Sequence, residues 1–168
     1  MIRKMEEKDI PDVLQIWLET NIRAHNFIEK EYWTGNYEMV KQILPEAEVY
    51  VYEDEKNGQI VGFIGMNNQY VEGLFVKESA QSRGIGKQLL DHAKSRKTEL
   101  RLSVYQKNVR AMRFYLRDNL SRTKISRKAH FSRVTEVVEC RQMCWNLHRM
   151  QHICSRYATK ILICIGHF

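Results

Sequence analysis

Apolar and polar residues recur with two different periods along the first 118 or so residues of the chain. Apolar side chains spaced three or four residues apart predict α-helices, which we expect to begin at Asp9 and to cover 29–44, 84–97 and 108–117. Short apolar or β-branched runs predict strands over 2–4, 49–53, 60–67, 69–76 and 99–104. Between the second and third strands, Asn57 and Gly58 are expected to supply the positive φ angles of a hairpin turn. The pattern predicts a mixed α/β (α+β) fold.

The chain changes character near residue 120. Up to Asn119 it carries 18 basic and 18 acidic residues, whereas the remainder carries 9 and 2 and so accounts for the whole net charge of +7. Both prolines and seven of the eight glycines lie before Leu120, and the four cysteines all lie after it. We therefore divide the chain into a domain over 1–118 and an atypical basic, Cys/His-rich tail over 119–168.

The placement of the charges limits the classes of partner. A domain without net charge, followed by a tail without a nucleic-acid-binding motif, argues against a nucleic-acid partner. No run of about 18 apolar residues is present to span a membrane, and the start MIRKMEEKDI lacks the apolar stretch of a secretory signal. We expect no membrane partner and a cytoplasmic location.

A metal site in the tail is a further possibility, because Cys140, Cys144, His148 and His152 recur every four residues. On one helix these side chains would form a stripe about 18 Å long. A single tetrahedral zinc ion needs four ligands around one point, so we expect no metal site.

The most informative segment is the loop between the predicted strand 69–76 and the helix 84–97. It holds Gln81, Arg83, Gly84 and Gly86. Free amides and the dipole of a helix's first turn attract phosphate, and glycine allows a close approach. Arg83 and Lys87 can add positive charge at the rim. The spacing fits neither a Walker loop nor a Rossmann fingerprint, and the alternative is that the glycines only cap a turn.

The same segment resembles the acetyl-coenzyme A motif of the GNAT superfamily, the Gcn5-related N-acetyltransferases. That motif follows an apolar strand end such as LFV and has the form Q/R-x-x-G-x-G/A, matched here by Gln81, Ser82, Arg83, Gly84, Ile85 and Gly86. The family's second signature is an Asn that opens a helix carrying Ala and then Phe-Tyr, matched by Asn108, Ala111, Phe114 and Tyr115. The resemblance covers Met1 to about Asp118.

The resemblance implies a central, mostly antiparallel sheet with flanking helices, whose fourth and fifth strands splay apart to admit the cofactor. These strands are 69–76 and 99–104. It also implies that the backbone of Leu74, Phe75 and Val76 pairs with the pantetheine arm of acetyl-coenzyme A. Around the pyrophosphate it places Gln81 and the amides of Ser82, Arg83, Gly84, Ile85, Gly86 and Lys87. Asn108 is expected to bond the pantetheine or cysteamine part.

Acetyl transfer to an amine needs a base for the amine and an acid for the leaving thiolate. Tyr115 stands where the family often has its general acid; the alternative is a core aromatic. We select Glu72 as the base because strand alternation places it on the same side as Leu74 and Val76. The alternatives are a solvated carboxylate or an anchor for substrate charge. The amide of Phe75 or Val76 is expected to donate to the thioester oxygen.

The acceptor side is expected to be formed by the first helices and the loop 24–36. His25, Tyr32, Trp33 and Tyr37 are candidate wall residues, although packing is the simpler role for all four. We expect the acceptor to be a primary amine: a protein N-terminus, a lysine or a small amine. We expect the protein to be a monomer or a homodimer. The alternatives to an active N-acetyltransferase are coenzyme A binding without turnover, a basic nucleic-acid-binding module, and a catalytically impaired family member.

The tail departs from the family, whose members normally add two antiparallel strands after the tyrosine helix. From Leu120 onward, alternation is weak and no hairpin signal is present. We therefore expect these strands to be missing and the tail to be a divergent or frame-shifted end, which reading the coding DNA in its other frames would test. A sheet without them would have an exposed edge.

Overall fold

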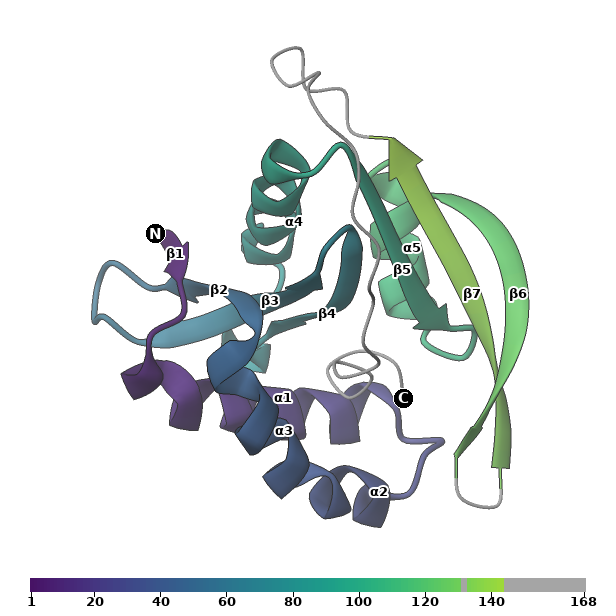
Figure 1. Cartoon of the computed structure of the whole chain (residues 1–168), viewed down its shortest axis with the longest axis horizontal. Coiled ribbons are helices and arrows are strands. Elements are labelled where there is room, and N and C mark those ends of the chain that lie inside the picture. The colour runs from purple at the N-terminus through teal and green to yellow at the C-terminus, as the bar shows by residue number, and fades with distance from the viewer. Residues whose placement is uncertain (131–132, 144–168) are drawn as a thin grey trace.

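The computed structural model describes residues 1–130 and 133–143 (Figure 1). Its strands are β1 (Ile2–Lys4), β2 (Glu48–Glu53), β3 (Ile60–Asn67), β4 (Tyr70–Val76), β5 (Glu99–Tyr105), β6 (Ser121–His130) and β7 (Arg133–Met143). Its α-helices are α1 (Ile10–Ala24), α2 (Lys30–Gly35), α3 (Tyr37–Ile43), α4 (Ile85–Arg96) and α5 (Val109–Arg117). None of the helices in these ranges is both long and apolar enough to cross a membrane.

The seven strands of the described part of the chain form one sheet in the order β1-β2-β3-β4-β5-β7-β6. Only the β4–β5 pair is parallel, so the predicted mixed fold with a mostly antiparallel sheet is confirmed. Two apolar clusters lie on its opposite faces. One packs α1, α2 and α3 against residues such as Phe63, and the other packs α4 and α5 against residues such as Ile64 (Figure 1).

Two local predictions were wrong. The expected helix over 29–44 is two helices, because Gly35 and Asn36 interrupt it, and the Asn36 side chain donates to the Tyr32 carbonyl at 2.6 Å. In the β2–β3 connection only Gly58 has a positive φ, of 70°. The longer turn places Asn57 elsewhere, where its side-chain oxygen accepts from the amide of Gln59 at 3.1 Å.

The expectation that the closing strands are missing was also wrong. β7 pairs antiparallel with β5 along the whole of β5, and β6 pairs with β7. Ladder hydrogen bonds come from the main chain, and the segment 121–143 contains no proline or glycine to interrupt them. The free edge of β5 therefore gains a partner although side-chain alternation in the segment is weak. The proposed boundary at 118/119 stays a prediction.

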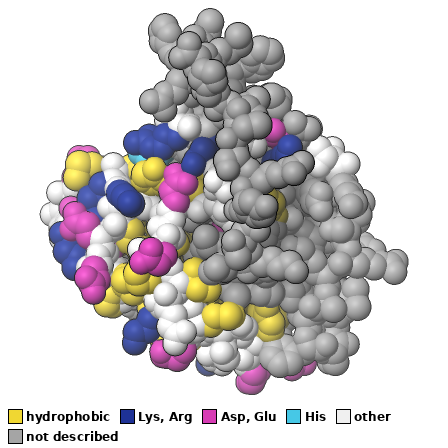
Figure 2. Space-filling view, in the orientation of Figure 1, with side chains coloured by type: hydrophobic (Ala, Val, Ile, Leu, Met, Phe, Trp, Pro, Cys, Tyr) yellow, Lys and Arg dark blue, Asp and Glu magenta, His cyan; other side chains and the backbone are white. Residues whose placement is uncertain are grey.

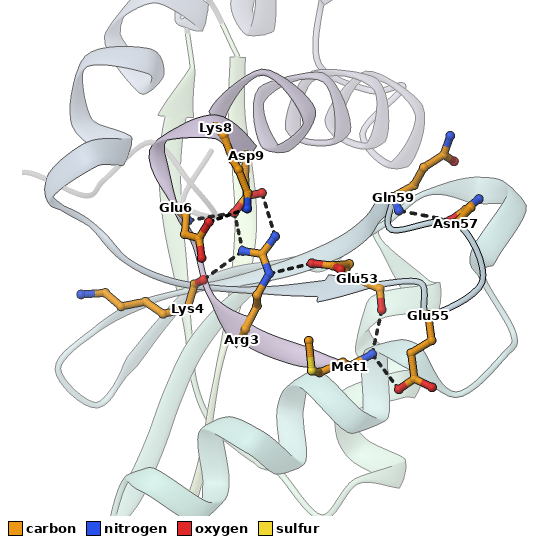
Figure 3. Close-up of polar contacts among 10 residues, drawn as sticks. All are labelled: Met1, Arg3, Lys4, Glu6, Lys8, Asp9, Glu53, Glu55, Asn57 and Gln59. Atoms are coloured by element: carbon orange, nitrogen blue, oxygen red, sulfur yellow. Dashed lines mark hydrogen bonds and ion pairs between the residues drawn. The ribbon is translucent and has the colours of Figure 1, made fainter.

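A charged network joins β1, the start of α1 and β2 (Figure 3). Arg3 binds both carboxylate oxygens of Asp9, at 2.6 and 2.9 Å, and its Nε donates to Glu53 at 2.7 Å. Asp9 is buried and also accepts from the amide of Glu6 at 2.8 Å. The hydrogen bond from Arg3 lowers the pKa of the Asp9 carboxyl below its ordinary value. The network fixes the edge strand β1 to the helix that follows it.

We predict that Asp9→Asn lowers the free energy of unfolding by about 3 kcal/mol at pH 7, because it leaves Arg3 without its buried counter-charge. Since the pKa of Asp9 is lowered in the folded state, its contribution is fully present above the ordinary aspartate pKa of about 4 and is lost as the pH falls through the folded-state value. In denaturant unfolding, the difference in the free energy of unfolding between wild type and variant should therefore become smaller below pH 4. Glu7→Gln, an exposed change in the same turn, is the control; an equal loss in both variants would contradict the prediction.

Candidate functional site

β4 and β5 are paired over only two residues each. Tyr70 lies opposite Arg101 and Val71 opposite Leu102, after which no pairing continues within the described residues. The remainder of β4 separates from β5, as the ribbons in Figure 1 show. The predicted splaying of the fourth and fifth strands is confirmed, and beyond Val71 no other described strand pairs with this side of β4.

The register of β4 on β3 determines which main-chain groups point toward the diverging strand. The amide of Lys77 donates to the carbonyl of Val61 at 2.8 Å. In an antiparallel ladder the direction alternates with each residue, so the groups of Phe75 point toward β3 and those of Leu74 and Val76 point away from it. The side chain of Gln81 donates to the Val76 carbonyl at 2.9 Å. This geometry favours the backbone of Leu74 and the amide of Val76 over Phe75 as contacts for a ligand.

The loop before α4 presents a row of free amides. Gly84 precedes the helix with φ 80°, and Ser82 also has a positive φ, of 62°. The first amide with an acceptor is that of Gln88, which donates to the Gly84 carbonyl at 3.0 Å. Within the described residues, the amides from Ser82 to Lys87 form no hydrogen bond. Such a group of amides at a helix N-terminus is suited to an anion.

Two basic side chains stand at this loop, and both are paired with carboxylates. Arg83 lies 3.4 Å from Asp54. Lys87 lies 2.6 Å from Asp91 and 3.5 Å from Asp118, and its hydrogen bond with Asp91 raises the pKa of the ammonium. Both basic side chains are more than half exposed, so they can turn toward a ligand.

The second glycine of the motif lies against β4 and α5. A Cβ on Gly86 would lie 3.4 Å from Leu74 and 3.6 Å from Phe114, which are side chains of β4 and α5. Ile85 is buried beneath the helix start. These are ordinary van der Waals distances, so packing alone does not require a glycine at position 86, while Ile85 anchors the loop.

α5 contributes Asn108 and Tyr115. Asn108 caps the helix, since its side-chain oxygen accepts from the amide of Ala111 at 3.1 Å. Tyr115 is buried, and burial together with the nearby Cys140 thiol raises the pKa of its phenol well above the ordinary value. The phenol is therefore neutral at physiological pH and keeps a proton to donate. Sequence reasoning missed its neighbour Cys140, which β7 brings opposite Leu102.

Strand alternation predicted that Glu72 lies on the same side of β4 as Leu74 and Val76. This prediction was wrong. The β3–β4 register shifts between Gly65 and Met66, which makes Glu72 the extra residue of a β-bulge. Leu74 and Val76 pack with the α4–α5 cluster, whereas Glu72 accepts from the Asn67 side chain at 3.3 Å. A bulge re-aims side chains. The carboxylate is 5% exposed, on the face that carries α1 and α2.

Other residues on that face follow from the pairing. Asn67 lies opposite Tyr70, whose hydroxyl bonds Ser103 at 2.5 Å. Ser103 lies between Leu102 and Val104, which both belong to the opposite cluster. Glu72, Tyr70 and Ser103 therefore lie on the face that carries α1 and α2, next to the point where β4 leaves β5.

The candidate wall residues divide into core and partly exposed groups. Trp33 and Tyr32 are buried at 1% and 7% exposure, and Tyr37 packs against the same cluster, which supports packing for these three. His25 is half-buried, and its Nε2 lies 3.2 Å from Nδ2 of Asn108. No local pattern could reveal this contact, because 83 positions separate the two residues.

The described residues give no support to other classes of site. Among them, no group of three or more His, Cys, Asp or Glu side chains is placed to hold a metal ion. Cys144, His148 and His152 lie outside the described residues. Basic and acidic side chains are interspersed on the described part of the face shown in Figure 2.

The geometry defines a class of protein: a sheet opened between two parallel strands, with an anion-binding helix start beside the opening. Residues 45–118 match the family model for an acetyltransferase (GNAT) domain. The chain belongs to the GNAT family of N-acetyltransferases, which use acetyl-coenzyme A as acyl donor, as the sequence motifs predicted.

Two related proteins are peptidyl-lysine N-acetyltransferases. The chain is 36% identical over 117 residues, 68% of its length and 79% of the relative's, to peptidyl-lysine N-acetyltransferase YiaC of Escherichia coli K12. The chain is also 32% identical to peptidyl-lysine N-acetyltransferase YjaB of the same strain over 114 residues, which is 68% of this chain and 77% of YjaB.

Solved structures share the fold over a longer part of the chain. The solution structure of apo YjaB from E. coli superimposes with a TM-score of 0.75 at 27% identity, over 84% of this chain and 95% of that one. A Salmonella typhimurium acetyltransferase, yncA, solved with acetyl-CoA, gives a TM-score of 0.64 at 17% identity, over 92% and 98%. Since 1–118 is about 70% of 168 residues, these matches extend into the segment after residue 118.

We predict that Gly84→Ala weakens coenzyme A binding by about tenfold or more, a loss equivalent to one charge-assisted hydrogen bond. The positive φ of 80° disfavours a side chain, and the loop would relax away from the geometry that gathers its amides. Calorimetric titration with coenzyme A measures the effect.

Gly58→Ala is the matched control. Gly58 has a φ of 70°, and a Cβ there meets nothing within 4 Å. Both substitutions should therefore cost about 1 kcal/mol of stability, but only Gly84→Ala should change the dissociation constant. Equal affinities in the two variants would show that the loop does not bind the ligand.

Proposed function

We propose that the protein transfers the acetyl group of acetyl-coenzyme A to lysine side chains of proteins. The observation that carries the proposal is the position of the buried Glu72 carboxylate, at the bulge where β4 leaves β5 and on the face of α1 and α2. A lysine ammonium is the acceptor whose charge suits that carboxylate. The relatives YiaC and YjaB are peptidyl-lysine N-acetyltransferases, which supports the same acceptor for this protein.

The cofactor is proposed to lie along β4. Its pantetheine arm adds to the unpartnered side of Leu74 and Val76 as a further strand would, and Asn108 bonds the arm from α5. The pyrophosphate lies on the free amides from Ser82 to Lys87. In this arrangement Gln81 orders the strand end by binding the Val76 carbonyl.

The reaction needs no covalent enzyme intermediate. Glu72 accepts a proton from the lysine ammonium, directly or through water, and the amine nitrogen bonds the thioester carbon. The carbonyl oxygen becomes negative and is stabilised by the amide of Val76. When the carbon–sulfur bond breaks, Tyr115 protonates the thiolate. Its raised pKa keeps the phenol protonated until then. As the carbonyl re-forms, the nitrogen loses its second proton to water; Glu72 then releases the first proton to solvent and the Tyr115 phenolate regains one from solvent.

The domain boundary, the cytoplasmic location and the choice between monomer and homodimer stay predictions. The alternative of a catalytically impaired family member assumed that the closing strands are missing. The structure has these strands, β6 and β7, so that assumption no longer holds. Coenzyme A binding without turnover is the alternative that the acceptor experiment separates from the proposal.

We predict turnover with a peptide that has an internal lysine and a blocked N-terminus, and little with a peptide that has a free N-terminus and no lysine. Coenzyme A release gives the rate, and mass spectrometry locates the acetyl group. Turnover on the second peptide or on small amines alone would contradict the lysine assignment, whereas tight cofactor binding without any turnover would contradict the enzyme.

We predict that Glu72→Gln and Tyr115→Phe each lower kcat about 100-fold, the usual contribution of a general base or acid. Both variants should keep their affinity for coenzyme A. Glu99→Gln is the control for a buried strand carboxylate, since Glu99 is 7% exposed and bonds Arg101. Tyr52→Phe is the control for a phenol, because Tyr52 forms no hydrogen bond within the described residues. Equal losses in the controls would indicate structural effects.

A further inference from the structure

His25 follows the last residue of α1 and starts the connection to α2. Its ring contacts aromatic rings from three directions: it stacks on Trp33 with centroids 5.3 Å apart, and meets Tyr105 and Phe27 edge-on at 5.0 and 5.7 Å. These rings belong to α2, to β5 and to the connection itself. The orientation of the imidazole is therefore set by packing.

The partner of His25 is equally constrained. The side-chain oxygen of Asn108 accepts from the amide of Ala111 as the cap of α5. That bond identifies which end of the Asn108 amide is the oxygen, so the NH₂ group is the end that lies 3.2 Å from Nε2 of His25. An amide NH₂ can only donate.

These two constraints fix the state of the imidazole. Nε2 must accept from Asn108, so His25 is neutral with its proton on Nδ1. A protonated imidazole would turn an N–H toward another N–H. Asn108 cannot relieve this by rotating its amide, because rotation would break the cap on Ala111.

We propose that His25 is a positioning residue, which holds the Asn108 side chain in the orientation that receives the pantetheine arm and does so only while its imidazole is neutral. The inference rests on the proposed role of Asn108 in cofactor binding. After the bonds to Ala111 and His25, Asn108 retains one N–H and one oxygen lone pair for a ligand. Because His25 starts the connection between α1 and α2, its hydrogen bond to Asn108 also links the proposed acceptor side to the proposed cofactor site.

The described surroundings of His25 are mostly aromatic. Among the described residues, the groups placed around it include the aromatic rings of α2 and β5, Phe27 of its own segment, and Asn108. The Tyr105 phenol is neutral as well, since burial and the nearby Tyr32 raise its pKa. The ammonium of Lys107 lies 5.6 Å from the centroid of the Phe27 ring, and a cation beside this group disfavours a second one.

Two substitutions separate the hydrogen bond from the packing. His25→Gln places an amide oxygen close to the position of Nε2 and so keeps an acceptor that does not titrate. His25→Leu keeps bulk but removes the acceptor. By calorimetry at pH 7.5, we expect the leucine variant to bind coenzyme A about tenfold more weakly, the loss of one hydrogen bond of about 1.4 kcal/mol, and the glutamine variant within about threefold of wild type. His92→Gln, which changes a half-buried histidine on α4, is the control.

The pH dependence provides a readout that a structural role would not move. Wild-type affinity should fall between about pH 7.5 and 5.5, where imidazoles titrate, and this dependence should be absent in His25→Gln. The comparison cancels the titration of the phosphates of coenzyme A, which both proteins share. Parallel profiles in the two proteins would overturn the proposal.

A double-mutant cycle connects the effect to Asn108. In an Asn108→Ala background, His25→Leu should cause no further loss of affinity; an additive loss would overturn the proposal. If the leucine variant fails to fold, ¹⁵N NMR of the wild-type imidazole decides, because the proposal requires the Nδ1–H tautomer at neutral pH. Wild-type affinity retained in His25→Leu overturns the positioning role alone, whereas a wild type that does not bind coenzyme A overturns the proposed function as well.

Discussion

The interrupted pairing of β4 and β5 is the constraint on which the rest of the site depends. Two parallel strands that stop pairing after Val71 and Leu102 leave main-chain donors and acceptors that no other strand of the described residues pairs. Unpaired strand edges seek partners, and a polyamide such as pantetheine can supply them. The sheet remains intact because β5 is held on its other side by β7 along its full length. Closing strands thus stabilise an opening elsewhere in the same sheet.

Protonation states around the opening are set by burial and by hydrogen bonding more than by ion pairs. Tyr115 stays protonated because a buried phenolate would be costly. His25 stays neutral because Asn108 can offer it only donors. The cations of the loop are paired with surface carboxylates such as Asp91 and remain charged. The proposed acid, the proposed positioning residue and the loop before α4 therefore keep the forms that the proposed acetyl transfer needs near neutral pH.

The sequence predicted those parts of the site that depend on neighbouring residues. The loop from Gln81 to Lys87 and the cap at Asn108 are local, and both lie where they were expected. The direction of Glu72 depends on a bulge in the β3–β4 register, which no single strand reveals. The His25–Asn108 contact depends on the tertiary fold. The strands β6 and β7 were missed because pairing with β5 depends on main-chain groups, whereas alternation describes side chains.

The measurement that tests the central claim most directly is an amide-resolved NMR titration of the wild-type protein with coenzyme A. The largest shift changes should fall on the amides from Ser82 to Lys87, on Leu74 and Val76, and on the Asn108 side chain, while β1 and β2 stay unchanged. Shift changes spread over the surface, or confined to elements away from the β4–β5 opening, would contradict the claim that the diverging strands and the helix start form one binding site.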